Sequence, residues 1–144
     1  MQKWMRETEA RRKGISMKLK NILIVVSDID KAEDFYREMF GLQVIYRTRD
    51  NRILTDGLVL QSKSGWEAEF GEDEKQDEIE RTSAPTWELY FEDYDLEDFA
   101  KKLEATYPNI TVVTPLTTLE WGQKIMRIQD LDKNLIEIRT PISV

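Results

Sequence analysis

The sequence contains a degenerate internal repeat, which constrains the fold more than any other feature of the chain. One copy reads Asp28-Ile29-Asp30 with Glu33-Asp34-Phe35, and the other reads Asp93-Tyr94-Asp95 with Glu97-Asp98-Phe99. In each copy, a strand-like apolar run precedes the aspartates and a helical pattern follows them. Two copies of one supersecondary unit predict a chain built from two similar modules.

The first module is expected over about residues 17–70. Asn21 to Val26 is an Ile- and Val-rich run typical of a buried strand. Asp30 followed by Glu33 has the spacing of a capping box, and the helix that begins there is expected to end at Gly41. Further strands are predicted at residues 42–49, 53–54, 58–61 and 66–70.

The second module is expected over about residues 84–141. An acidic segment, Gly71 to Ser83, precedes it and is predicted to be a solvated loop between the modules. The helix of the second module is predicted from Asp95 to Ala105. Its strands are predicted at residues 87–91, 111–113, 117–121, 124–129 and 135–139.

Composition narrows the possible functions. The 144 residues carry a formal net charge of −7, and an acidic chain is poorly suited to a phosphate backbone, so we expect no nucleic-acid partner. The chain has no Cys and no His. Their absence removes the thiol nucleophile, the commonest general base and the commonest transition-metal ligand.

The ends of the chain carry no targeting signal that we recognise. No apolar run approaches the ~20 residues of a membrane helix, so we expect no membrane partner. Residues 1–16 are basic but lack the apolar stretch of a secretory signal, and we interpret them as an N-terminal extension of a single domain at residues 17–144. These features predict a cytoplasmic protein.

The stretch from Trp121 to Arg139 reads as a strand, a tight turn at Asp130 to Asn134, and a final strand. Period-two geometry sends Ile136 and Ile138 to one face of the final strand and Glu137 to the other. A carboxylate in the middle of a strand has two explanations. It lies either on an exposed face or in a site lined by the sheet.

This stretch resembles the closing hairpin of the vicinal oxygen chelate superfamily, which contains glyoxalases, bleomycin-resistance proteins and ring-cleaving dioxygenases. The pattern there is Trp-Gly, a strand, Asp-Pro-Asp-Gly-Asn, a strand and Glu. Here Leu131 stands in place of the proline and Lys133 in place of the glycine. The resemblance implies an α+β fold in which two βαβββ modules form a curled mixed sheet, or cup, with helices on its convex face.

The resemblance also implies positions for a site. The places of the superfamily's metal ligands correspond here to Asn21, Gln61, Glu88 and Glu137. Alternation along the strand at residues 87–91 places Trp87, Leu89 and Phe91 towards the helix. The same alternation leaves Glu88 facing the cup. Two carboxylates that share a cup repel, so one is expected to have a raised pKa unless a cation lies between them.

Aromatic residues suggest a second kind of site. Trp and Tyr rings beside carboxylates bind cationic or flat ligands by stacking and cation–π contacts. The candidates for lining such a pocket are Tyr90, Trp121 and Trp66. For each of them, packing in the core or at a dimer contact is the alternative explanation.

The resemblance, weighed against these features, implies two possible functions, and the pairing common in the superfamily implies a homodimer. The first is a homodimeric protein that sequesters a small molecule without a cofactor, similar to bleomycin-resistance members. The alternative is a metal-dependent lyase or isomerase resembling glyoxalase I, with Glu137 as ligand or base, Glu88 as its partner, and Mn, Mg, Ni or Zn as the metal. The absence of His argues against ring-cleaving dioxygenase and fosfomycin-modifying activity.

Overall fold

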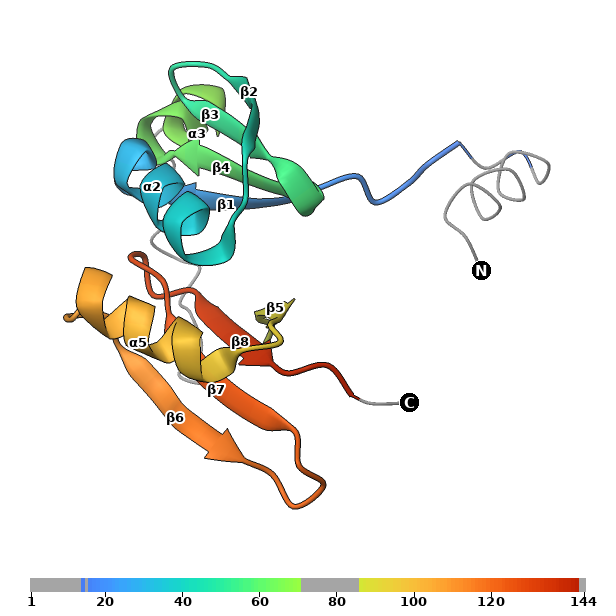
Figure 1. The fold of residues 1–144 in the computed structure, drawn as a ribbon. Coiled ribbons are helices and arrows are strands. Elements are labelled where there is room, and N and C mark those ends of the chain that lie inside the picture. Colours follow the sequence, from blue (N-terminus) through green and yellow to red (C-terminus); the bar gives the residue numbers. More distant parts are fainter. Residues whose placement is uncertain (1–13, 15, 71–85, 143–144) are drawn as a thin grey trace.

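The computed structural model describes residue 14, residues 16–70 and residues 86–142 (Figure 1). The acidic segment predicted to be a loop and almost all of the predicted N-terminal extension lie outside these residues. The described part forms two mixed four-stranded sheets with helices packed against them, which confirms the predicted α+β class. The sheets are not closed into a barrel, an arrangement consistent with a curled cup.

The first module has the order βαβββ. It consists of β1 (Ile22–Val26), α2 (Ile29–Phe40), β2 (Val44–Arg47), β3 (Asn51–Leu54) and β4 (Leu58–Ser62), with the 3₁₀ turn η1 (Thr55–Gly57) before β4. The sheet order is β1-β4-β3-β2, and β1 runs parallel to β4. The helix α2 ends as predicted, because Gly41 adopts the left-handed conformation with a φ of 69°.

The second module repeats this topology. It consists of β5 (Leu89–Glu92), α5 (Leu96–Thr106), β6 (Val112–Thr118), β7 (Lys124–Gln129) and β8 (Leu135–Arg139). Its sheet order, β5-β8-β7-β6, matches the first sheet strand for strand, and β5 runs parallel to β8. The internal repeat in the sequence is therefore a repeat of structure.

Some local predictions were wrong. Residues 66–70, predicted as a strand, belong to helix α3 (Lys63–Phe70), because the Ser62 hydroxyl accepts a hydrogen bond from the Gly65 amide and starts a helical turn. The cap of α2 is Asp28 rather than Asp30, since the Asp28 side chain accepts from the Lys31 amide.

The strands around the hairpin also differ from expectation. The segments predicted at 111–113 and 117–121 form one strand, β6, with irregular register against β7. The strand stops at Thr118, and Leu119 to Gly122 makes a turn in which the Gly122 amide donates to the Leu119 carbonyl. Gly122 has a φ of 92°, a conformation that favours glycine.

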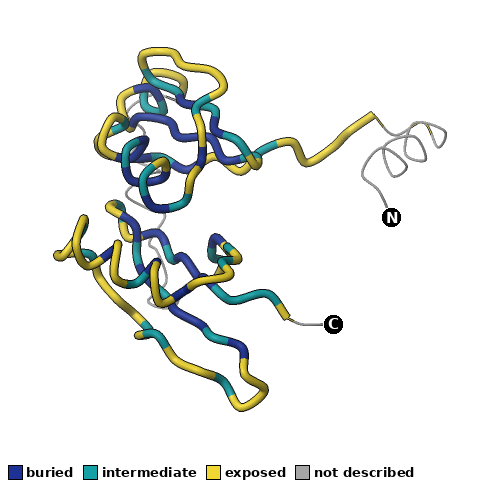
Figure 2. The backbone as a smooth tube through the Cα atoms, in the orientation of Figure 1, coloured by how far each residue is buried: buried dark blue, intermediate teal, exposed yellow. Residues whose placement is uncertain are grey.

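Both modules contribute to one hydrophobic core. Figure 2 shows the buried residues gathered between the helices and the sheets. The rings of Phe40 in α2 and Phe91 in β5 lie 4.3 Å apart, and Phe40 also contacts Phe99 in α5. Ile136 and Ile138 are buried in the same core, as the alternation of β8 predicted.

A buried polar junction also joins the modules. The Tyr36 hydroxyl in α2 donates a 2.6 Å hydrogen bond to Asp130 Oδ2 in the β7–β8 turn. Asp130 Oδ1 accepts from the amides of Asp132 and Asn134, and the Asn134 side chain donates to Oδ2. Burial and the charge of Asp130 raise the pKa of Tyr36, so its hydroxyl stays protonated and remains a donor.

The β7–β8 turn keeps a regular shape although Lys133 stands where the superfamily pattern has glycine. Lys133 has a φ of 67°, so it adopts the left-handed conformation that the family's glycine would take. The Lys133 amide donates to the Asp130 carbonyl and the Asp132 carboxylate accepts from the Ser27 amide. The turn therefore keeps its shape without glycine and touches the end of β1.

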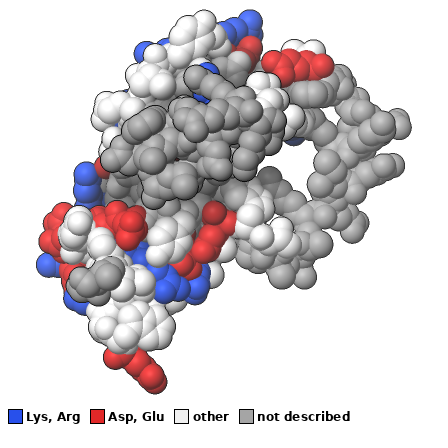
Figure 3. Space-filling model, turned by 90° about the vertical axis from the view of Figure 1, so that its right-hand side faces the viewer, with Lys and Arg blue, Asp and Glu red and all other residues white. Residues whose placement is uncertain are grey.

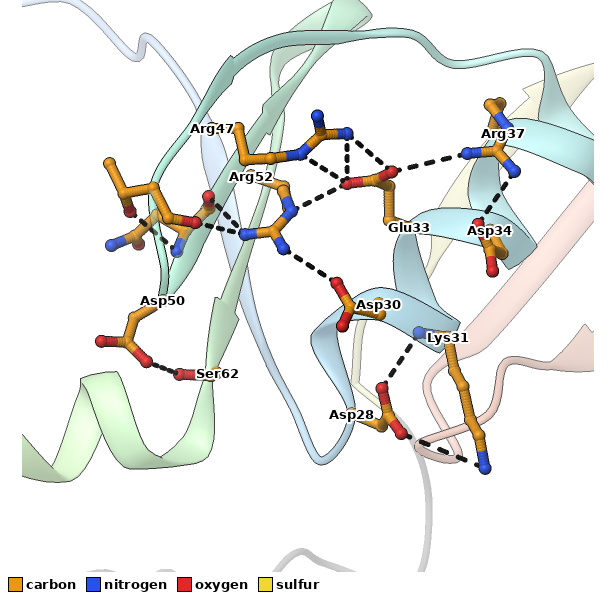
Figure 4. A network of polar contacts seen from close by, with 12 residues as sticks. Asp28, Asp30, Lys31, Glu33, Asp34, Arg37, Arg47, Asp50, Arg52 and Ser62 are labelled. Carbon is orange, nitrogen blue, oxygen red and sulfur yellow. Dashed lines mark hydrogen bonds and ion pairs between the residues drawn. The ribbon is translucent and has the colours of Figure 1, made fainter.

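A charged network attaches α2 to the β2–β3 hairpin (Figure 4). Glu33, which is only 8% exposed, accepts hydrogen bonds from Arg47 and Arg52, and Arg37 approaches from the next helical turn. Arg52 is itself buried and also pairs with Asp30. Burial alone would raise the pKa of Glu33, but the hydrogen bonds and charges of the two β-strand arginines outweigh it and lower the pKa.

We predict that Tyr36→Phe destabilises the protein by about 1–3 kcal/mol, because it leaves the buried Asp130 carboxylate without one donor. The measurement is the free energy of unfolding in urea. Tyr94→Phe is the matched control, since Tyr94 is 90% exposed and its loss should change the free energy by less than about 0.5 kcal/mol. Equal effects of the two substitutions would contradict the structural role of the junction.

We predict that Glu33 stabilises the folded protein at neutral pH and that this stabilisation is lost in acid. Because its pKa is lower in the folded than in the unfolded state, its ion pairs stabilise the protein above the unfolded pKa of about 4.5, and this stabilisation is lost as pH falls through the folded pKa. Unfolding free energies measured from pH 7 down to pH 3 should fall more steeply in the wild type than in Glu33→Gln. Parallel curves would show that Glu33 does not contribute.

Candidate functional site

The candidate site is built around Glu137 on the face of β8 opposite the core. Although this face points away from the shared core, Glu137 is 3% exposed, so the explanation of an exposed strand face is excluded. The register places Glu137 between Tyr90 on β5 and Arg127 on β7. Neighbouring strands therefore deliver an aromatic ring and a cation to either side of one buried carboxylate.

Two guanidinium groups hold the Glu137 carboxylate. Arg127 Nε donates to Oε1 at 2.6 Å, and Arg139 Nε donates to Oε2 at 2.9 Å. Charge-assisted hydrogen bonds of this length are the strong class, and they compensate for burying the charge. Both oxygens of Glu137 are thus already engaged by this chain's own cations.

Glu88, which the resemblance placed in the same cup as Glu137, lies beside this ion pair. Its carboxylate is 4.0 Å from Arg127 Nε and interacts with Glu137. Burial and the nearby negative charge of Glu137 raise the pKa of Glu88, while Arg127 and Arg139 partly oppose that rise. The two acidic residues therefore differ in role: Glu137 is clamped by arginines, whereas Glu88 is half-exposed and has a raised pKa.

A chain of hydrogen bonds connects Trp121 to the cluster. The indole Nε1 donates to Gln123 Oε1, which also accepts from Arg139 Nη1. The Gln123 side chain is fixed in turn because its Nε2 donates to the Thr140 carbonyl. Trp121 remains 67% exposed, so its ring is held in place but accessible.

Sequence reasoning missed Arg127, Gln123 and Arg139 as site residues. Strand pairing was the available signal, because an arginine on β7 at the register of Glu137 had to face it across the hairpin. That register depends on the turn between Asp130 and Asn134, whose geometry was open in the sequence.

The other predicted site residues lie in the first module. Gln61 on β4 is 3% exposed, and its Oε1 accepts no hydrogen bond from the described residues. Asn21 immediately precedes β1, and β1 pairs with β4, the strand that carries Gln61. Within residues 16–70 and 86–142, no hydrogen bond or ion pair joins either side chain to Glu88 or Glu137. The four predicted metal positions are therefore divided between the modules.

Trp66 and Trp87 lie elsewhere than predicted. Trp66 is half-buried in α3 rather than on a strand of the cup. Trp87 precedes β5 and is 53% exposed, so it does not pack under the helix as Leu89 and Phe91 do. The remaining predicted aromatic, Tyr90, is 52% exposed on β5.

The donors around Glu137 do not fit a resident divalent metal. Its two oxygens are hydrogen-bonded to guanidinium groups, and a cation placed there would be repelled by Arg127 and Arg139. Among the described residues, no group of three or more Asp and Glu side chains is arranged to hold a metal ion. The arginines fill the electrostatic role that the sequence left open for a metal.

Comparisons with known proteins agree with this fold. The family model for the glyoxalase-like domain matches residues 19–143. No curated protein matches in sequence.

No helix in the described part of the chain is long and apolar enough to cross a membrane.

Several solved structures share the architecture. A glyoxalase/bleomycin resistance protein/dioxygenase family enzyme from Burkholderia phytofirmans is 18% identical, covering 88% of this chain and all of its own, with a TM-score of 0.69. A fosfomycin resistance protein from Listeria monocytogenes is 15% identical over 88% of this chain and 94% of its own, with a TM-score of 0.63. Lactoylglutathione lyase from Agrobacterium tumefaciens is 21% identical over 83% and 90%, with a TM-score of 0.55.

The two βαβββ modules and the match to the family model show which family of proteins this chain belongs to. This chain belongs to the glyoxalase-like domain family of the vicinal oxygen chelate superfamily. The superfamily hosts several chemistries on one scaffold, so the site has to carry the functional argument.

Proposed function

We propose that this protein binds and sequesters a small molecule in its cup without a metal cofactor, similar to bleomycin-resistance members of the family. The observation that carries this proposal is the double arginine clamp on Glu137. A carboxylate whose oxygens are both engaged is a poor metal ligand and a weak base, because either role requires breaking a buried ion pair.

The accessible groups around the clamp favour a flat ligand with a hydrogen-bonding or cationic group. Tyr90 and Trp121 have exposed rings. Tyr90 lies two residues from Glu88 and so on the same strand face, and Trp121 is connected to Arg139 through Gln123. Their faces offer stacking and cation–π contacts, and the Glu88 carboxyl offers a donor or an acceptor according to its protonation state. Gln123, itself bonded to Arg139, holds the Trp121 indole in position before a ligand binds.

The alternative function is a lyase or isomerase resembling glyoxalase I. One observation favours it: the raised pKa of Glu88 is the property expected of a carboxylate that takes a proton from carbon next to a carbonyl. In that reading Glu88 rather than Glu137 is the base. A metal would have to displace the guanidinium groups from Glu137, which weighs against this function.

We further propose that the protein acts as a cytoplasmic homodimer in which copies pair and share their cups. Support comes from β1 and β5, each of which is one of the two outer strands of its sheet among the described residues. Ile22 and Leu23 on β1 are 45% and 43% exposed, and Tyr90 on β5 is 52% exposed. Exposed apolar side chains on strands with one free edge are suited to a partner copy.

We predict that chelator-stripped protein gives no calorimetric heat with Mn, Ni or Zn at micromolar concentration, because the arginines already neutralise Glu137. The double variant Arg127→Met/Arg139→Met serves as the control, since it frees the carboxylate and should gain measurable affinity. Micromolar binding by the wild type that disappears in Glu137→Gln would instead support the lyase.

We predict that Trp121→Ala weakens the binding of flat aromatic cations by a factor of about 2 to 30, which corresponds to roughly 0.5–2 kcal/mol for a lost cation–π contact. Tyr90→Ala should act in the same direction. The measurement is a fluorescence titration with a panel of aromatic cations and neutral aromatics of equal size. Tyr94→Ala is the control, and an equal loss in all three variants would contradict the assignment of the ligand site.

A further inference from the structure

A cleft lies at the seam between the modules; Tyr90 lines it, but Glu137 and its two arginines do not. Its volume is about 430 Å³. Its floor is apolar and comes from both modules, with Phe40, Leu42 and Leu58 from the first and Leu89 and Phe91 from the second. The rim carries two acidic residues, Asp56 and Glu92. The cleft is thus suited to an apolar group flanked by positive charge.

The N-terminal arm leaves the folded body at the rim of this cleft. Ile22 and Gly57 both line it, and a Cβ built on Gly57 would lie 3.5 Å from the Lys20 carbonyl oxygen. Residues 16–20 then run away from the body as an extended segment (Figure 1). Met17 and Leu19 in this segment are 86% and 89% exposed. The described residues 16–20 therefore begin next to the cleft, and their apolar side chains are exposed.

The charge of the arm is opposite to that of the body. Residues 1–20 contain seven Lys and Arg against two Glu, whereas the whole chain has 21 basic and 28 acidic residues. Near the start of the arm, Trp4 and Met5 are flanked by Lys3 and Arg6. An apolar pair between two cations matches an apolar floor between two carboxylates. Figure 3, by comparison, shows acidic and basic side chains intermixed over the lower part of the molecule.

The distances permit docking within one chain. Thirteen residues separate Arg6 from Lys20 and span up to about 45 Å when extended, so the segment can return to a cleft that starts beside Lys20. Closing a loop of this length has a modest entropic cost, and the tether gives the segment an effective concentration of the order of millimolar. A second copy would have to compete with that concentration.

We propose that the N-terminal segment of the chain docks into its own seam cleft, with Trp4 and Met5 on the apolar floor and Lys3 and Arg6 against Asp56 and Glu92. The segment acts as a built-in ligand that covers the junction between the modules. Because Tyr90 also lines the cleft, the docked segment lies beside the face that carries the candidate ligand site. This proposal does not depend on whether the cup binds a ligand, but it competes with the proposed pairing of copies along β1 and β5, because Ile22 and Tyr90 line the cleft.

The absence of Cys in the chain allows a direct test by disulfide trapping. The full-length double variant Gln2→Cys/Tyr90→Cys keeps both rim carboxylates and the four docking residues. Under mild oxidation we expect an intramolecular disulfide that forms at least about tenfold faster than in Gln2→Cys/Glu104→Cys, whose second cysteine lies on the exposed face of α5. Non-reducing electrophoresis and peptide mass spectrometry give the rates and the linkage.

Two changes made in the Gln2→Cys/Tyr90→Cys background test the proposed contacts. Trp4→Ala should slow trapping by removing the apolar anchor, and Asp56→Asn with Glu92→Gln should slow it and remove its sensitivity to salt. All of the changed positions in the body are exposed, and thermal melts check that the fold is retained. Equal trapping rates at positions 90 and 104 would overturn the proposal. Covalent dimers whose yield rises with protein concentration would assign the cleft to another copy and overturn docking within one chain.

Discussion

The arrangement of the two modules depends on the hydrogen bond between Tyr36 and Asp130. It joins the helix of the first module to the β7–β8 turn of the second in a buried environment, where an unpaired carboxylate would be costly. The same carboxylate caps the turn through the amides of Asp132 and Asn134. One side chain thus fixes both the packing between modules and the register of β7 against β8, and this register brings Arg127 opposite Glu137.

The candidate site follows from that register. Arg127 and Arg139 approach Glu137 from two strands, and Gln123 connects the group to Trp121. The result is a cluster in which opposite charges are matched before any ligand binds, while Glu88 and two aromatic rings remain accessible. In the proposed binding function, such a site recognises a ligand by shape and hydrogen bonding. The two glutamates, which look equivalent in sequence, have different surroundings: two arginines hold Glu137, and Glu88 is partly exposed.

The fold was predictable because it is repeated. The duplicated aspartate motif predicted the two modules, and the alternation in β8 predicted its core face. The helix at residues 63–70 was missed because Trp66 to Phe70 alternates like a strand, and its start depends on the Ser62 side chain. The arginine clamp was missed because it depends on pairing across a turn in which Lys133 takes the place of glycine. Local sequence patterns predict helices and strands, whereas the contacts of Arg127 with Glu137 depend on how β7 pairs with β8.

The central claim is that arginines, and not a metal, neutralise Glu137. The most direct test is anomalous X-ray diffraction from crystals grown with excess Mn²⁺. The account predicts that both arginine side chains remain hydrogen-bonded to Glu137 and that no anomalous peak lies within about 2.0–2.6 Å of its carboxylate, the range for hard divalent cations. A peak at that distance, with the guanidinium groups displaced, would contradict the account and favour the metal-dependent lyase.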